Sequence, residues 1–235
     1  MKFALILNND TDGVSQPALN LNLHLKKSGH KSKILTLHKA KKNADVIQVK
    51  RSLVSRIFLQ ILSFAQKKRN ILFGFDYSTT KYEYIKKYTN DVDIIIIFTF
   101  YKIISNNILN KLFKAKKIIY FRPFDSELLT GGCHFHIPTK KFQSNCSNCP
   151  KFFLPGFAKF QIANQTKKKI IFNRYKPRIL AANKFVGKIY KSVFKRSKIS
   201  TVHIGVSPKR IKVYSKKQAR NLLKLKHDEK IILFG

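Results

Sequence analysis

The sequence predicts an α/β protein whose core is a doubly wound parallel sheet. Apolar strand-like runs alternate with helix-like stretches along the chain, and this order is typical of parallel strands joined by helical crossovers. The run Asp93–Phe98 is rich in isoleucine, as expected of a central strand that is covered on both faces. Hydrophobic residues make up 44% of the 235 residues, which predicts a packed core rather than a disordered chain.

The strands are predicted, in order, at Lys2–Leu7, Lys33–Leu37, Asp93–Phe98, Lys117–Phe121, Arg178–Ala182 and Ser200–His203. The helices between them are predicted at Pro17–Ser28, Ser52–Lys67, Tyr82–Tyr88, Ser105–Phe113, Phe157–Tyr175 and Lys184–Arg196. The first helix has Leu19, Leu23 and His24 near one face. It ends before Gly29, because glycine is the usual helix stop.

The second helix has an apolar face at helical spacing, formed by Leu53, Ile57, Ile61 and Phe64. The sequence from Arg122 to about Pro155 is predicted to be a loop.

The end of the chain carries the pattern of a new α/β unit. Ser215 and Gln218 form a capping box that predicts the start of another helix. After it, Lys230–Gly235 has the apolar pattern of a buried strand. A strand of this kind belongs inside a sheet, so the sequence predicts that Lys230–Gly235 opens a second α/β domain.

The chain is strongly basic, with 48 lysines and arginines against 11 acidic residues and a formal charge of +37. Such a charge favours polyanions such as nucleic acid, anionic lipid headgroups or phosphate-bearing substrates; a lysine-rich solvated surface explains it equally well. No motif that reads DNA or RNA is present, so no specific nucleic acid is expected. The longest apolar run, Ile94–Phe98, is too short to span a membrane, and Met1–Leu7 lacks the features of a signal peptide. A cytoplasmic location is therefore expected.

The loop after Lys117–Phe121 concentrates the reactive side chains. It contains Asp125, the sequence Thr130-Gly131-Gly132-Cys133-His134, a second histidine at His136, and the sequence Cys146-Ser147-Asn148-Cys149-Pro150. Parallel sheets place their chemistry just beyond the carboxyl ends of strands. A carboxylate there can accept a proton or hold a sugar hydroxyl, and it can equally be a turn or helix-capping aspartate.

The cysteines admit two interpretations. Cys133, Cys146 and Cys149, together with His136 or His134, provide four ligands of the types that zinc prefers. Alternatively, the segment is an ordinary loop with three thiols.

Two other segments are candidate binding elements. The loop Asn8–Gly13 follows the first strand, and Gly13 would let the backbone approach a phosphate near the start of a helix; it is otherwise a simple turn. The helix Phe157–Tyr175 mixes apolar residues with Lys167, Lys168 and Lys169. It either lies on an anionic membrane or packs its apolar side inward and leaves its basic side in water.

The loop residues resemble glycosyltransferase family 4, the retaining sugar transferases with the GT-B fold, and in particular the bacterial polysaccharide-biosynthesis members. The resemblance lies in Thr130-Gly131-Gly132-Cys133-His134, followed by Cys146-x-x-Cys149-Pro150. It extends to Ile204-Gly205-Val206-Ser207 and to the last helix and apolar run. Phe124 stands where the family has a histidine, and Thr139 where it often has another cysteine.

The resemblance implies how the chain is divided into domains. Residues 1–205 would form an N-terminal, Rossmann-like acceptor-binding domain, with 122–155 as a loop insertion. Residues 206–235 would form the linker helix and the first strand of a C-terminal donor-binding domain that this sequence does not contain. Negligible transfer by these 235 residues alone is then expected, and a separate chain with a donor domain is an expected partner.

The resemblance also assigns roles. Asp125 would be catalytic, Thr130, Gly131, Gly132 and His134 would bind the acceptor, and Gly13 would lie near the donor phosphate. The co-substrate would be a nucleotide-sugar, and the acceptor a glycan or lipid-linked sugar at the inner face of the plasma membrane. No cofactor is required, although zinc could occupy the cysteine set. The alternative is a basic, non-enzymatic protein that binds a membrane surface or nucleic acid and is stabilised by zinc.

Overall fold

A computed structural model describes residues 1–67, 76–100, 102–134, 146, 155–205 and 212–232. The chain divides into two compact units, Met1–Ile204 and Gly205–Gly235, and each is considered by itself.

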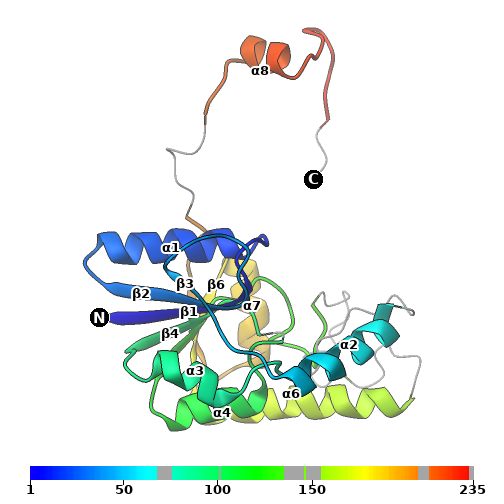
Figure 1. Cartoon of the computed structure of the whole chain (residues 1–235). Helices are drawn as coiled ribbons and strands as arrows, with labels where there is room; N and C mark the ends of the chain where they lie inside the picture. The colour runs from blue at the N-terminus through cyan, green and yellow to red at the C-terminus, as the bar shows by residue number, and fades with distance from the viewer. Residues whose placement is uncertain (68–75, 101, 135–145, 147–154, 206–211, 233–235) are drawn as a thin grey trace. The chain divides into compact units, whose positions relative to one another are not determined.

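The first unit is built on a seven-stranded sheet in which every pair of neighbouring strands is parallel (Figure 1). Its strands are β1 (Lys2–Asn9), β2 (Lys31–His38), β3 (Val46–Gln48), β4 (Ile94–Ile97), β5 (Ile118–Phe121), β6 (Arg178–Ala181) and β7 (Lys198–Thr201). Their order across the sheet is β3-β2-β1-β4-β5-β6-β7. The strand order reverses between β1 and β4, as in a doubly wound, Rossmann-like sheet. The predicted fold class is therefore confirmed.

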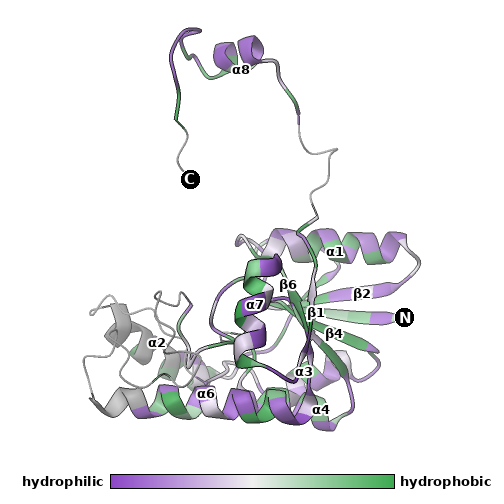
Figure 2. Cartoon of the chain, turned by 180° about the vertical axis from the view of Figure 1, so that it is seen from behind, coloured by the Kyte–Doolittle hydropathy of each residue, from purple (hydrophilic) through white to green (hydrophobic). Residues whose placement is uncertain are grey.

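Helices cover both faces of this sheet. The helices that pack on it are α1 (Ser15–Lys27), α3 (Tyr82–Thr89), α4 (Asn106–Lys114), α6 (Pro155–Tyr175) and α7 (Lys184–Val193), whereas α2 (Leu53–Lys67) lies to the side of these layers (Figure 1). Alternate residues of a strand point to opposite faces. Phe3, Leu5 and Leu7 of β1 accordingly pack with Ala18 of α1 on one face. On the other face, Ala4 and Ile6 belong to the core formed with α3, α4, α6 and α7 (Figures 1 and 2).

Two elements differ from the sequence-based prediction. The short strand β3 was not predicted, because three residues carry little periodicity; it adds to the sheet by pairing Val46 with Ile34. On α1 the buried residues are Ser15, Ala18 and Asn22, whereas Leu23 is 48% exposed. Of the residues predicted near one face, Leu19 packs against the core, whereas Leu23 and His24 are exposed.

Helix α2 forms as predicted, but its apolar face is exposed. Five large apolar side chains on α2 are at least 46% exposed: Leu53, Val54, Ile57, Phe58 and Ile61. Successive residues turn by 100° around a helix, so these five lie on one side of α2. The side chain of Phe64 lies outside the described residues.

The second unit contains α8 (Lys216–Leu222). The predicted capping box is present: the Ser215 hydroxyl accepts a hydrogen bond from the Gln218 backbone N–H, and the Gln218 side chain accepts one from the Ser215 N–H. The strand predicted at Lys230–Gly235 is absent from the described part, residues 230–232, where Ile232 is 94% exposed. No neighbouring strand pairs with this segment in the described residues, and an unpaired strand is not stable.

Across the described residues, no helix combines the length and apolarity needed to cross a membrane.

Candidate functional site

The carboxyl ends of β1, β4 and β5 meet at the point where the strand order reverses. Ile6 of β1 is paired with Ile97 of β4, and Ile97 is paired with Phe121 of β5. Asn8 and Thr99 both lie two residues beyond the Ile6–Ile97 pair, while Arg122 directly follows Phe121. Asn8 and Thr99 therefore continue the face of Ile6 and Ile97, whereas Arg122, one residue beyond Phe121, points to the opposite face, where its guanidinium lies over the Phe124 ring.

Each of these side chains has a buried polar atom with no hydrogen-bond partner in the described part of the chain. The atoms are Asn8 Oδ1, Thr99 Oγ1 and Arg122 Nη2. The other terminal nitrogen of Arg122, Nη1, donates to the carbonyl of Leu180 at 2.7 Å. Buried polar groups are nearly always paired, so each of these unpaired atoms is a candidate contact for a ligand or bound water at the end of its strand. Asn8 belongs to a loop that the sequence marks as a candidate binding element, whereas Thr99 and Arg122 belong to no motif.

Asp125 and His134 form the charged pair of the loop after β5. Their Oδ2 and Nδ1 atoms are 2.7 Å apart, and the side chains are 33% and 24% exposed. A carboxylate can only accept, so Nδ1 carries the proton and the neutral ring keeps its lone pair on Nε2. The hydrogen bond from Asp125 raises the pKa of His134 above its ordinary value, against burial, which lowers it.

The backbone around this pair is fixed by further hydrogen bonds. Asp125 Oδ1 accepts from the Glu127 N–H at 2.9 Å, and the Ser126 N–H donates to the His134 carbonyl at 2.8 Å. The hydroxyl of Tyr190, a fully buried residue of α7, donates to the Asp125 carbonyl at 2.9 Å. The pair is thus anchored to a core helix as well as to its own loop.

Helix α6 holds the next part of the loop with a buried polar face. Gln165 Nε2 donates to the Leu129 carbonyl at 2.9 Å, and Asn164 Nδ2 donates to the Gly131 carbonyl at 2.7 Å. Lys168 Nζ donates to the carbonyls of Glu127 and Thr130 at 2.6 and 3.1 Å. These contacts give four loop carbonyls a donor from one helix.

Helix α6 packs Ile171 and Phe172 into the core and leaves Lys167 and Arg174 exposed, as expected of a helix with an apolar inner side, but it also buries a polar face that was not expected. Gln161, Asn164, Gln165 and Lys168 are all buried, and Lys168 is only 1% exposed. Burial lowers the pKa of the Lys168 ammonium, and the charges of Glu127, Asp76 and Asp125 oppose that effect. In a sequence, a run of three lysines indicates a solvent-exposed face. Nothing in the sequence therefore predicts that Lys168 is buried.

The Thr130-Gly131-Gly132 turn packs tightly against α6. A Cβ atom on Gly131 would lie 2.3 Å from the Gln161 carbonyl oxygen, and Gly132 has a φ of 138°. Thr130 Oγ1 accepts from the N–H groups of Gly132 and Cys133 at 3.2 and 2.8 Å and contacts the Cys133 carbonyl at 2.9 Å. These three residues have structural roles here, and their predicted contacts with an acceptor stay predictions.

The cysteine set is only partly described. Cys133 and Cys146 form no disulfide, and Cys146 Sγ accepts a hydrogen bond from the Gly131 N–H at 3.2 Å. Cys149 and His136 lie outside the described residues, so zinc binding by these four residues stays a prediction.

A different set, Asp125, Glu127 and His134, brings ligand atoms within 4.8 Å of one another. Both Asp125 oxygens already accept hydrogen bonds, and the buried Lys168 ammonium supplies positive charge nearby. This set does not fit a resident metal ion.

The turn after β1 places a carboxylate at the start of α1. Asp12 Oδ1 accepts from the N–H groups of Val14 and Ser15 at 3.1 and 2.9 Å. The neighbouring Asn9 Oδ1 accepts from the Asp12 N–H at 2.8 Å. Gly13 is exposed, with open space around the position of a Cβ atom. The proximity of Gly13 to a donor phosphate stays a prediction, and Asp12 occupies the N–H groups that would favour such an anion.

The raised pKa of His134 predicts a pH-dependent contribution to stability. The folded pKa lies above the ordinary value of 6.5, so the contribution is fully present below about pH 6.5 and is lost as pH rises through the folded pKa. The stability difference between the natural chain and His134→Gln should therefore shrink as pH rises.

Urea unfolding of both proteins between pH 5 and 9 would measure this difference. The Asp125→Asn variant should show little of the pH dependence, because it lacks the carboxylate that favours the charged ring. Asp45→Asn, which removes a carboxylate that binds Lys26 on α1, is the control and should retain it. A stability difference between the natural chain and His134→Gln that grows with pH would contradict a raised pKa of His134.

No family model matches the sequence. No curated protein matches it either. Among solved structures, the chain is similar to the crystal structure of a UGT transferase from Siraitia grosvenorii in complex with UDP, with 9% sequence identity and a TM-score of 0.46. The similarity covers 94% of this chain and 51% of that protein, so this chain spans about half the length of that structure.

Proposed function

We propose that this protein is the acceptor-binding part of a glycosyltransferase. It would serve the transfer of a sugar from a nucleotide-sugar to a glycan or lipid-linked acceptor in surface polysaccharide biosynthesis. Its main support is the Asp125–His134 pair, which lies after β5 on the sheet edge that carries the unpaired polar atoms. The resemblance of Thr130–His134 to family 4 glycosyltransferases is the second support.

The chemistry of this edge suits a hydroxylated acceptor. Asn8 Oδ1 accepts hydrogen bonds, Arg122 Nη2 donates them, and the Thr99 hydroxyl does both. The hydroxyl groups of a saccharide both donate and accept, so they can pair with each of these atom types. Leaving such atoms unpaired is costly, so a ligand that pairs them gains both affinity and selectivity.

We propose that His134 takes the proton from the acceptor hydroxyl group that reacts. Asp125 holds the ring with its proton on Nδ1, and a neutral histidine ring is a base of the kind that can take a proton from a hydroxyl group. Phe124 cannot exchange a proton; its ring stacks on Phe98 and lies 5.5 Å from the Arg122 guanidinium. In this proposal His134 replaces the histidine that family 4 members carry at the position of Phe124.

The donor would be held outside residues 1–205, and the transfer would retain the configuration of the anomeric carbon, as in the family that the sequence resembles. No metal has a step in this proposal.

The proposal is tested by saccharide binding to the full chain. A panel of neutral and acidic oligosaccharides would be titrated while NMR follows the His134 ring. At least one saccharide should shift the His134 signals, and Asp125→Asn and Thr99→Val should each weaken its binding about tenfold. His24→Gln, on the exposed side of α1, is the control and should bind normally. If no saccharide shifts the His134 signals, the proposal is wrong.

A second candidate function, binding to an anionic membrane surface, is favoured by α2. Its exposed apolar side presents Leu53, Val54 and Ile57, and Arg51 and Arg56 are close in sequence at the start of the helix. Apolar residues beside basic ones suit a helix that lies in the headgroup region of an acidic bilayer. The net charge of +37 complements such a surface. This function is compatible with transfer to a lipid-linked acceptor.

The Val54→Glu/Ile57→Glu variant should bind phosphatidylglycerol-containing vesicles at least tenfold more weakly than the natural chain. In the natural chain these two apolar side chains move from water into the bilayer on binding, and the variant loses that favourable transfer. Vesicle sedimentation at several salt concentrations would measure binding, which should also weaken as salt screens the charges. The matched control is Leu222→Glu/Leu223→Glu, which changes two exposed leucines on or beside α8. Equal loss of binding in both variants would exclude α2 as the specific contact.

A further inference from the structure

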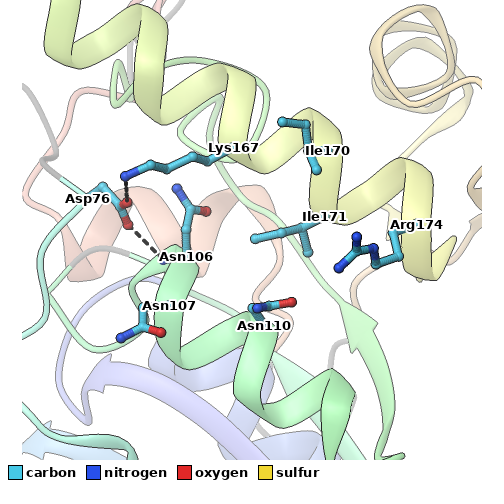
Figure 3. A pocket seen from close by; sticks show the side chains of 8 residues that line it. All are labelled: Asp76, Asn106, Asn107, Asn110, Lys167, Ile170, Ile171 and Arg174. Atoms are coloured by element: carbon cyan, nitrogen blue, oxygen red, sulfur yellow. Dashed lines mark hydrogen bonds and ion pairs between the residues drawn. The ribbon is translucent and has the colours of Figure 1, made fainter.

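A shallow pocket of about 280 Å³ lies between α4 and α6 (Figure 3). Three asparagines of α4 line one side: Asn106, Asn107 and Asn110. The facing side comes from α6 and combines two cations, Lys167 and Arg174, with the apolar Ile170 and Ile171. Amides, cations and an apolar wall are brought together from two helices that are far apart in the sequence.

Asn106 has an oxygen that lacks a partner. The residue is 3% exposed, and its Nδ2 donates to Asn164 Oδ1 at 2.7 Å. Asn164 Nδ2 in turn donates to the Gly131 carbonyl at 2.7 Å. A carbonyl can only accept, so this chain of contacts fixes the orientation of both amides. Asn106 Oδ1 is left buried and without a hydrogen-bond donor in the described part of the chain.

Figure 3 shows the Asn106 side chain pointing from α4 toward α6. The missing partner of Oδ1 is a hydrogen-bond donor, such as a hydroxyl group of a ligand.

Neighbouring groups also favour a hydroxylated ring as the ligand. The Tyr175 hydroxyl is 3.1 Å from Asn110 Oδ1 and donates to it, which leaves the Asn110 NH₂ group as a donor. Asn107 is exposed at the rim. The wall formed by Ile170 and Ile171 suits the apolar face of a sugar ring.

The charges select for an anion. Asp76 Oδ1 accepts from the Asn106 N–H at 2.7 Å, and Asp76 Oδ2 is 3.9 Å from Lys167 Nζ. Lys167 is 64% exposed, so this ion pair is weak and the ammonium can contact a ligand. With Arg174, the pocket carries two cations against one carboxylate.

We propose that this pocket binds a hydroxylated ring that carries a negative charge, as in a sugar phosphate or a uronic acid. Asn106 Oδ1 accepts from a ring hydroxyl, Asn107 and Asn110 donate to others, and Lys167 and Arg174 contact the anionic group. The site is distinct from the Asp125–His134 pair and does not depend on the transfer function proposed above.

The test is calorimetric titration of the full chain with four probes: glucose 1-phosphate, glucuronic acid, glucose and inorganic phosphate. At least one charged sugar should bind tenfold or more tightly than both glucose and inorganic phosphate. The charged sugar that binds more tightly identifies the anionic group. If inorganic phosphate binds as tightly as both charged sugars, the basic surface alone is responsible and the proposal is overturned.

Variants locate the binding. Lys167→Met/Arg174→Met should weaken binding of the charged sugar at least tenfold, and Asn107→Ala should reduce its advantage over inorganic phosphate. The control, Lys184→Met/Lys188→Met, removes the same charge from exposed positions of α7 and should bind normally. Equal weakening in the control would overturn the assignment. If Lys167→Met/Arg174→Met loses binding of the charged sugar while acceptor saccharides still shift the His134 NMR signals, the pocket is a separate site from the proposed transferase site.

Discussion

Replacing Gly131 with alanine is expected to lower the free energy of unfolding by about 2–4 kcal/mol, since overpacking in a closed interior forces neighbouring backbone to move. The added Cβ would lie 2.3 Å from the carbonyl oxygen of Gln161 and 2.7 Å from its carbonyl carbon. Both atoms belong to the backbone of α6, so no flexible side chain can turn aside. Shifting α6 would also lengthen its contacts with the Leu129 and Gly131 carbonyls.

Urea denaturation at one pH would measure this loss. The matched control is Gly13→Ala, where nothing lies within 4 Å of the added atom, and its stability should change by less than about 0.5 kcal/mol. If both variants lost the same stability, the effect would come from glycine content and not from the contact with α6.

Replacing Lys168 with methionine is expected to cost about 3 kcal/mol or more. The methionine fills much of the same space, but it leaves the carbonyls of Glu127 and Thr130 without their donor. Each unsatisfied buried carbonyl costs about 1–3 kcal/mol. The variant also removes the cation whose charge interacts with the carboxylates of Glu127 and Asp125.

Lys167→Met provides the comparison, because it removes the same charge from the adjacent, 64% exposed position. Its effect should stay within about 0.5 kcal/mol, as is usual for an exposed ion pair. Thermal and urea unfolding of the two variants would measure the difference. Similar losses in both would mean that the total charge of the helix matters and that the buried contacts of Lys168 do not.

The sequence was sufficient for the fold because strands and helices have strong local signals. The isoleucine run of β4 and the alternation of elements predicted a doubly wound parallel sheet, and the seven-stranded sheet confirms it. Errors arose where tertiary packing outweighs periodicity. The face of α1 is set by Ala18, which packs with Leu5 and Leu7, and by Asn22, which donates to Asp45 at 3.0 Å, so Leu23 stays exposed.

The site was predictable only in part. Asp125 and His134 were singled out because they belong to one recognisable motif, and the structure places them in contact. Thr99 and Arg122 carry no motif, and their unpaired atoms become apparent only when β1, β4 and β5 lie side by side. The buried role of Lys168 likewise depends on how α6 docks, which charge patterns cannot reveal.

The polar contacts between α6 and the loop also constrain how this region becomes ordered. The carbonyls of four loop residues between 127 and 131 have donors on α6, so the loop loses these hydrogen bonds whenever that helix separates from it. The loop and the middle of α6 should then open and close as one cooperative unit in hydrogen exchange. The Asp125–His134 contact would then depend on the docking of α6, because both residues belong to the same loop.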